Sequence, residues 1–260
     1  MENNGSEQIL VSVIMPAYCC AATIQRAIDS ALMQEVPLEV LVLNDRSPDE
    51  LDTVMEKYRE VPRVRYLKNE ENLGAAATRN RGVQMARGRY VAFLDADDWW
   101  EKDKLKKQLA RMEQENVVLC STARELVTPQ GELTGRIIGV RERITYRSLL
   151  LHNCINCSSV LLETKVAREF PMTHEDSHED YITWLGILKK YGRAAAINEP
   201  LLKYRLTASG KSGSKLKSAR MTYSAYRYAG FGRAAAGALF CAYAVNGVAK
   251  YAAAYFRGKR

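Results

Sequence analysis

Three carboxylates within four residues follow an apolar run in the first half of the chain. Residues 90–94 are aromatic or aliphatic, and Asp95, Asp97 and Asp98 come directly after them. Such a run predicts a buried strand, and acids crowded at its end repel one another unless a cation compensates their charge. Mg²⁺ and Mn²⁺ prefer carboxylate and phosphate oxygens. The stretch therefore predicts a divalent metal site for a phosphate-bearing substrate. Acids also favour a helix N-terminus, but one acid would suffice for that.

A second acid, Asp45, follows the apolar run at residues 38–43. An acid in this position is most often an N-cap or turn residue. Ser47 has the stronger N-cap signature, because Pro48 occupies the first helical position and Glu50 the third. This interpretation leaves Asp45 available for a ligand.

A third acidic group, Glu179 and Asp180, opens an amphipathic helix predicted to end near Gly192. Acids in a first helical turn commonly only stabilise the helix. His174, Glu175, Asp176 and His178 crowd the same segment, but their spacing matches no regular metal-ligand pattern.

The elements that position these acids alternate between strand and helix. Strands are expected at residues 11–15, 38–43, 64–67 and 90–94, with helices between them, the third at 75–86. This alternation predicts an α/β fold whose mostly parallel sheet carries helices on both faces, with ligands beyond the carboxyl ends of the strands. After a helix at 102–114 the pattern changes to mixed strands, at 117–121 and 158–162, and a hairpin turning at 129–131.

Five short motifs in this order resemble the family 2 glycosyltransferases of the GT-A fold. They are Pro16-Ala17-Tyr18, Asn44-Asp45-Arg46-Ser47, the stretch from Asn72 to Asn80, Asp95-Ala96-Asp97-Asp98 and Glu179-Asp180. The match runs from about residue 11 to 205, and residues 202–217 further resemble bacterial teichuronic-acid, O-antigen and capsule-type enzymes. The resemblance implies a GT-A domain at 8–208, with a Rossmann-like nucleotide-binding half at about 8–98 and an acceptor half at about 99–208.

The resemblance also implies how a UDP-sugar would be bound. In the family, the acid at Asp45 accepts a hydrogen bond from uracil, and the loop of Pro16, Ala17 and Tyr18 contacts the base. The implied donor-binding set is completed by Arg79, Asp95 and Ala96. Asp97 would ligate Mn²⁺ or Mg²⁺ that bridges the diphosphate, with Asp98 as an alternative ligand.

The catalytic step implied by the family is transfer with inversion. Asp180 would be the general base that removes a proton from the acceptor hydroxyl, and Glu179 would orient it. The acceptor would be a glycan or a polyprenyl-diphosphate-linked sugar, which makes the chain a hexosyltransferase of cell-surface polysaccharide synthesis. Trp99 and Trp100 follow the acids and either stack on a sugar or pack in the core.

The net charge of +8 is concentrated at the C-terminal end, because residues 200–260 hold twelve Lys or Arg and no acid. Lys203 and Arg205 begin this basic segment and could reach anionic groups, after which residues 209–214 are linker-like. Residues 209–260 form a basic helical extension, and 234–256 are expected to be a helix at an anionic membrane surface. Lys250 and Asn246 argue against a membrane span. The alternative is a helix packed on the catalytic domain.

Other functional classes fit less well. The first strand is not followed by the Gly-x-Gly-x-x-Gly of a dehydrogenase. Two alternatives remain: a protein that binds nucleic acid through the basic tail, and a catalytically inactive protein that binds a sugar nucleotide. Our expectation is an enzyme with no nucleic-acid partner. The N-terminus lacks the features of a signal peptide, and the six cysteines form no framework. Cys154 and Cys157 have the spacing of half a zinc site or a redox motif, but no second pair or suitably spaced His completes it. They are interpreted as packing residues, with a metal or redox role as the alternative. We expect a cytoplasmic protein, peripheral at the inner face of the cell membrane.

Overall fold

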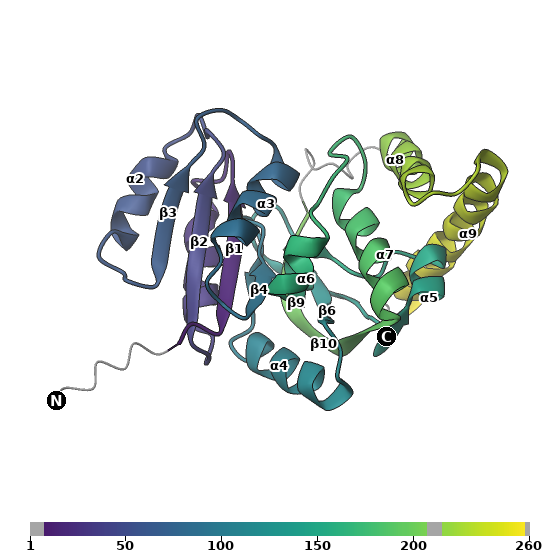
Figure 1. Cartoon of the computed structure of the whole chain (residues 1–260), viewed down its shortest axis with the longest axis horizontal. Helices are drawn as coiled ribbons and strands as arrows, with labels where there is room; N and C mark the ends of the chain where they lie inside the picture. The colour runs from purple at the N-terminus through teal and green to yellow at the C-terminus, as the bar shows by residue number, and fades with distance from the viewer. Residues whose placement is uncertain (1–7, 207–214, 258–260) are drawn as a thin grey trace.

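The computed structural model of this 260-residue chain describes residues 8–206 and 215–257. One curled sheet runs through the molecule, and helices cover both of its faces (Figure 1). The α/β architecture expected from the alternating pattern is confirmed.

The N-terminal half contributes four parallel strands, in the order β3-β2-β1-β4. Their bounds are β1 Val11–Ala17, β2 Leu38–Asn44, β3 Val64–Lys68 and β4 Tyr90–Phe93. All of β1 and β2 is buried or nearly so, because helices cover both sides. Ala17 lies beside Asn44, and Ile14 lies beside Phe93, so these three strands end at one edge.

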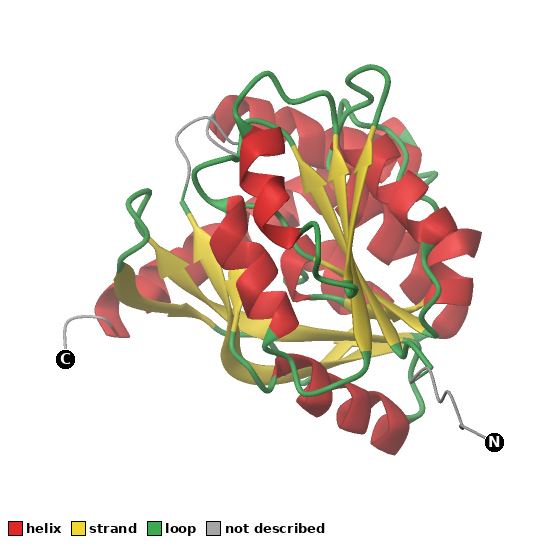
Figure 2. Ribbon diagram, turned by 90° about the vertical axis from the view of Figure 1, so that its left-hand side faces the viewer, coloured by secondary structure: helices red, strands yellow, loops and turns green. Residues whose placement is uncertain are grey.

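The second half extends the sheet with mixed strands, as the weaker alternation predicts (Figure 2). The strand β9 is antiparallel to both β4 and β6, whereas β6 and β10 are parallel. The bounds are β5 Trp99–Trp100, β6 Leu119–Val127, β7 Leu133–Ile138, β8 Arg143–Thr145, β9 Leu161–Glu163 and β10 Arg193–Arg205. The expected hairpin at 129–131 joins β6 to β7.

Two apolar cores fill the space between the sheet and its helices. On one face lie α1 (Ile24–Leu32), α2 (Leu51–Met55) and α4 (Lys104–Glu115). On the other face lie α3 (Ala75–Met85), α5 (Tyr146–Leu151), α6 (Thr164–Glu169) and α7 (Glu179–Tyr191). Two short 3-10 turns, η1 (Glu56–Tyr58) and η2 (Cys157–Ser159), lie between these elements.

Two local expectations are wrong. The helix after β2 begins at Leu51, with Glu50 in the cap position, so Ser47 is not its N-cap. The Ser47 hydroxyl instead donates to Asp49 at 2.5 Å and accepts from the Cys19 N–H at 2.7 Å. The strand expected over 158–162 covers Leu161–Glu163, because Ser158 and Ser159 form the turn η2.

The C-terminal helices α8 (Lys215–Tyr228) and α9 (Arg233–Arg257) pack beside α7 and α5 (Figure 1). Tyr226 and Ala236 are fully buried, and Phe240 and Tyr243 are half-buried against the same core. Phe240 and Tyr243 belong to the helix expected at a membrane surface, and both pack on the protein instead. The linker-like residues 209–214 lie outside the described chain. Within 8–206 and 215–257, no helix has both the length and the apolar character needed to cross a bilayer.

Candidate active site

The acids singled out from the sequence lie where the parallel strands end. Asp45 directly follows β2, and Asp95 follows β4 by two residues. Tyr18 follows β1 and is 51% exposed, whereas Ala17 and Ala96 are buried and Pro16 is half-buried. The Ala17 carbonyl accepts a hydrogen bond from the Asp45 N–H at 2.9 Å, which ties the ends of β1 and β2 together.

Asp45 holds three hydrogen bonds within the protein, so it is only partly available for a ligand. Its buried carboxylate accepts hydrogen bonds from Asn69 Nδ2 at 2.6 Å and from the backbone N–H groups of Leu73 and Gly74 at 2.8 and 2.9 Å. Two of these bonds reach Oδ1 and one reaches Oδ2. A carboxylate has about four acceptor positions. One position on Oδ2 is therefore left for a ligand, while the others shape the loop before α3.

The acidic segment after β4 places its three carboxylates at different depths. Asp95 and Asp97 are half-buried, whereas Asp98 is 1% exposed. Burial, together with the charge of Asp95, raises the pKa of Asp97 to about 6. Burial, with the charges of Asp97 and Asp95, raises the pKa of Asp98 well above its usual range. Negative charge is thus held in this segment at a cost in free energy, and a bound cation would lower that cost.

The donor atoms at this segment fit a divalent cation that is shared with a substrate. No other described side chain donates a hydrogen bond to the Asp97 carboxylate, and Asp98 Oδ2 is buried without a hydrogen-bond partner among the described residues. Asp98 Oδ1 accepts from the Arg205 N–H at 2.9 Å. Across the described chain no cluster of three or more His, Cys, Asp or Glu side chains could hold a metal alone. Further ligands would have to come from phosphate oxygens, which suits Mg²⁺ and Mn²⁺.

Arg79 joins the acidic segment to the acids at the start of α7. Its guanidinium contacts Asp95 Oδ1 at 2.6 Å and Glu179 Oε1 at 3.2 Å, and both Arg79 and Glu179 are more than 90% buried. The guanidinium is therefore committed to two carboxylates rather than to a nucleotide, and we interpret Arg79 as a positioning residue. This bridge brings Glu179 and Asp180, more than 80 residues away in sequence, to the edge where β4 ends.

The surroundings of Asp180 favour its protonated form. Burial and the neighbouring charge of Glu179 raise the pKa of Asp180 to about 7, and the charge of Arg79 opposes this rise. Its Oδ1 accepts the Tyr181 N–H at 2.7 Å, which fixes the carboxylate at the first turn of α7. A base with a pKa near neutrality can take a proton and release it again under working conditions.

The segment before α7 is held from two sides, which sequence reasoning missed. Glu175 Oε1 accepts from the Ala75 N–H at 2.7 Å, at the N-terminus of α3. From the other side, the His174 ring stacks on Tyr228 of α8 at 3.7 Å between centroids, and the Tyr228 hydroxyl donates to Asp176 at 2.8 Å. The crowding of acids and histidines in this segment was the sequence feature that could have indicated these contacts. They serve contacts between elements instead of a second metal site.

The two tryptophans after the acids belong to the core. Trp99 is 7% exposed, and the Arg26 guanidinium covers its ring at 3.3 Å from the centroid. Trp100 is 3% exposed, and its indole N–H donates to the Ser158 carbonyl at 2.8 Å. Of the two alternatives for these side chains, the structure supports core packing.

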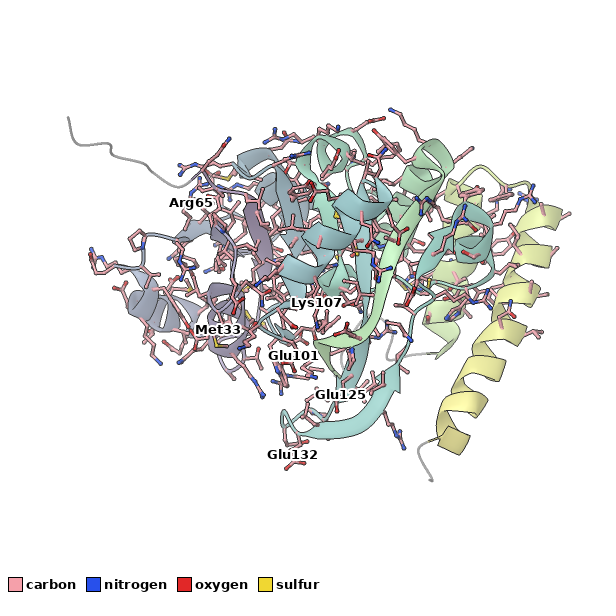
Figure 3. All side chains as sticks on the ribbon, turned by 90° about the horizontal axis from the view of Figure 1, so that it is seen from below. Met33, Arg65, Glu101, Lys107, Glu125 and Glu132 are labelled. Atoms are coloured by element: carbon pink, nitrogen blue, oxygen red, sulfur yellow. The ribbon has the colours of Figure 1, made fainter. Side chains whose placement is uncertain are left out.

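The first basic residues of the C-terminal region are paired within the domain. Lys203 contacts Glu101 at 2.9 Å and Glu125 at 3.0 Å, two residues labelled in Figure 3. Arg205 donates from Nε to the Asp97 carbonyl and from a terminal nitrogen to the Pro129 carbonyl. The expectation that Lys203 reaches an anionic ligand is therefore wrong, because its charge is neutralised internally.

Cys154 and Cys157 form no disulfide, and burial raises the pKa of the Cys157 thiol well above its usual range. A raised thiol pKa disfavours the reactive thiolate. This agrees with the packing role expected for the pair.

Comparison with known sequences gives one family. Residues 12–163 match the model described as Glycosyl transferase family 2. TuaG of Bacillus subtilis (strain 168), named as a teichuronic acid biosynthesis glycosyltransferase, is 36% identical over 220 residues, covering 84% of this chain and 87% of TuaG. WfaP of Escherichia coli, named as a UDP-Glc:alpha-D-GlcNAc-diphosphoundecaprenol beta-1,3-glucosyltransferase, is 33% identical over 254 residues, covering 96% of this chain and 98% of WfaP.

Solved structures share the fold. TarS of S. aureus, solved as residues 1–349 with UDP-GlcNAc, superposes with a TM-score of 0.69 at 20% identity, over 90% of this chain and 71% of that one. The mannosyltransferase PcManGT of Pyrobaculum calidifontis, solved with GDP-Man and Mn²⁺, gives 0.69 at 19% identity, over 96% and 76%. These similarities confirm the GT-A fold.

Proposed function

The chain belongs to glycosyl transferase family 2, and from this premise we propose that it is an inverting hexosyltransferase that uses a UDP-sugar. The acceptor is a hydroxyl of a glycan or of a lipid-linked sugar in bacterial cell-surface polysaccharide synthesis. The names of TuaG and WfaP support this substrate class. The observation that carries the proposal is the Arg79 bridge, which unites Asp95 of the acidic segment with Glu179 beside Asp180.

The donor half of the site is assigned to the ends of β1 and β2. The remaining acceptor position on Asp45 Oδ2 suits the imide N–H of uracil, which cytosine does not offer. Tyr18 is the exposed aromatic residue at the same edge and is assigned to the base. Pro16 and Ala17 hold the backbone of this loop, and Asp95 and Ala96 are assigned to the ribose side.

The chemical step is divided between two groups of acids. Asp97, with Asp98 behind it, would hold Mg²⁺ or Mn²⁺, which when bound neutralises charge on the departing diphosphate. Asp180 accepts the proton of the acceptor hydroxyl as that oxygen attacks the anomeric carbon from the face opposite UDP. Glu179, itself paired with Arg79, keeps the first turn of α7 in place. Attack from the opposite face inverts the anomeric configuration, and no covalent intermediate is needed.

UDP binding is expected to depend on a divalent cation. In calorimetry with Mn²⁺, chelation by EDTA should weaken UDP binding by at least about tenfold, ~1.4 kcal/mol, and Asp97→Ala should bind weakly in either condition. Glu132→Ala removes an exposed acid from the β6–β7 turn, labelled in Figure 3, and should behave as wild type. Equal UDP affinity with Mn²⁺, with EDTA and in Asp97→Ala would remove the metal from the mechanism.

Activity itself is tested by UDP release from a set of UDP-sugars, with and without a polyprenyl-diphosphate-linked acceptor. Acceptor-dependent UDP release supports the proposal. Binding of UDP without any release would instead indicate an inactive sugar-nucleotide binder.

The end of the C-terminal extension is proposed to contact an anionic membrane at the inner face of the cell. The sequence places Lys250, Arg257, Lys259 and Arg260 beyond Asn246 with no acid among them. Val245, just before them on α9, is 69% exposed, unlike the packed Tyr226 and Ala236. Basic residues near anionic lipid each contribute about 1 kcal/mol.

A chain ending at Asn246 should sediment less with anionic liposomes than the full chain does. Ending there keeps Tyr226 and Ala236, which are buried, and removes four basic residues. Circular dichroism should show that the shortened chain is folded like the full chain. Replacing the same four residues by Gln in the full chain should have a similar effect, and added salt should weaken binding of the full chain. If the full chain stays in the supernatant at low salt, the extension has a structural role only.

A further inference from the structure

A cavity separate from the acidic edge lies between the β7–β8 connection, α5 and α9. Its volume is about 550 Å³, within the range of small-molecule sites. Figures 1 and 3 both show α9 running beside α5 at this place. The Asn246 amide of α9 donates to the Leu151 carbonyl of α5 at 3.3 Å and so joins two of its walls. The lining residues used below are Val140, Arg141, Arg143, Ile144, Leu151 and Cys154.

The cavity combines unpaired positive charge with an apolar wall. Arg141 and Arg143 are exposed, and neither has a carboxylate within ion-pair distance anywhere in residues 8–206 or the described part of the extension. Glu142 between them contacts Arg111 at 3.8 Å instead and does not line the cavity. Leu151 supplies aliphatic surface, because it is 42% exposed, whereas Ile144 in the same wall is 1% exposed. Such a surface favours a ligand with an anionic group attached to a hydrocarbon chain.

Tyr181 links the proposed general base to one wall of the cavity. Tyr181, next to Asp180, donates its hydroxyl to the Leu149 carbonyl at 2.9 Å, and Leu151 of the same short helix lines the cavity. A second connection, between the cavity and the acidic segment, runs along the backbone. Cys154 lines the cavity, and Ser158, four residues later, accepts from the Asp95 N–H at 3.1 Å. Four residues span at most about 14 Å, which limits the backbone separation between Cys154 in the cavity wall and Ser158 beside Asp95.

We propose that this cavity receives the diphosphate and the first isoprenoid units of a lipid-linked acceptor. Arg141 and Arg143 bind the phosphate oxygens, Leu151 contacts the hydrocarbon, and the acceptor sugar extends toward Asp180. The inference rests on the proposed function for the identity of the acceptor. It adds the place where the acceptor's charge is recognised, on residues that contact neither UDP nor the metal.

Binding of farnesyl diphosphate, a water-soluble prenyl diphosphate, tests this site in the full chain with the donor site saturated by UDP and Mn²⁺. Arg141→Gln/Arg143→Gln should weaken binding by at least about tenfold, because each lost charge-assisted contact is a strong one. The matched control is Arg136→Gln/Arg147→Gln, which removes two exposed arginines of β7 and α5 that do not line the cavity. The control should bind like wild type. Leu151→Ala should weaken farnesyl diphosphate but leave inorganic diphosphate unchanged.

Each outcome separates the site from the proposed function. Equal affinity in wild type and Arg141→Gln/Arg143→Gln, or equal weakening in the control pair, would overturn the inference even if UDP-sugar is consumed. Inorganic diphosphate binding as tightly as farnesyl diphosphate would reduce the cavity to a free-anion site and overturn its assignment to a lipid. Arginine-dependent prenyl binding without any sugar transfer would support the site while the proposed function fails.

Discussion

Replacing Asp180 by Asn is expected to lower kcat by about 10²–10⁴-fold, the usual contribution of a general base, and to leave UDP affinity unchanged. The amide oxygen of Asn can still accept the Tyr181 N–H that Asp180 Oδ1 accepts at 2.7 Å, so α7 should begin in the same way. What is lost is the carboxylate that takes the proton. Single-turnover transfer rates and UDP calorimetry on the same preparation separate the two effects.

The pH dependence of kcat gives an independent check on Asp180. Because its pKa is raised to about 7, the base is protonated and inactive below that pH, and kcat should rise as the pH increases through 7. Asp180→Asn should lose this rise. Asp176→Asn makes the same charge change in the exposed part of the preceding segment and should keep both the rate and the profile. A near-normal rate in Asp180→Asn would move the role of base to Glu179.

Replacing Arg79 by Met is expected to reduce the free energy of unfolding by ~3–5 kcal/mol. The substitution removes the cation between Asp95 and Glu179 and leaves the Glu179 carboxylate buried without that partner. Urea unfolding of the wild type and the variant measures the change.

Arg81→Met is the matched control on the same helix. Arg81 donates to the Lys68 carbonyl and to the Asn69 side chain. Both acceptors are neutral, so the loss of Arg81 leaves no buried charge without its partner. A loss of about 1 kcal/mol is expected there. Adding Glu179→Gln to Arg79→Met should recover part of the lost stability, since Gln removes the buried negative charge that Arg79 neutralised. Equal losses of unfolding free energy in Arg79→Met and Arg81→Met would show that the Arg79 bridge contributes no more to stability than the neutral contacts of Arg81.

The sequence predicts the strands and the acids that follow them because both depend on local pattern. Apolar runs in β1, β2 and β4 reveal buried parallel strands, and the carboxyl ends of such strands meet at one edge. What local pattern cannot predict is the partner across the fold. The Ser47 signature is a real N-cap pattern, yet its hydroxyl is taken by Cys19 and Asp49.

The same limit applies to the site. Asp45 was recognised as a site residue, but its three hydrogen bonds come from a loop about 25 residues later. Arg79 and Glu179 are 100 residues apart, and so are Ala75 and Glu175. Only the curled sheet brings these pairs together, and no periodicity in the chain encodes that curvature.

These contacts between residues a hundred positions apart limit how the enzyme can recombine with its relatives. A chimera that joins the first half of one family member to the second half of another would separate Arg79 from its Glu179 and Ala75 from its Glu175. Asn80, which donates to the Met172 carbonyl at 2.7 Å, crosses the same boundary. Exchange of donor specificity by swapping halves should therefore succeed only when the two parents already match at these positions. Where the two parents differ at these positions, the segment 172–180 must be taken from the same parent as α3.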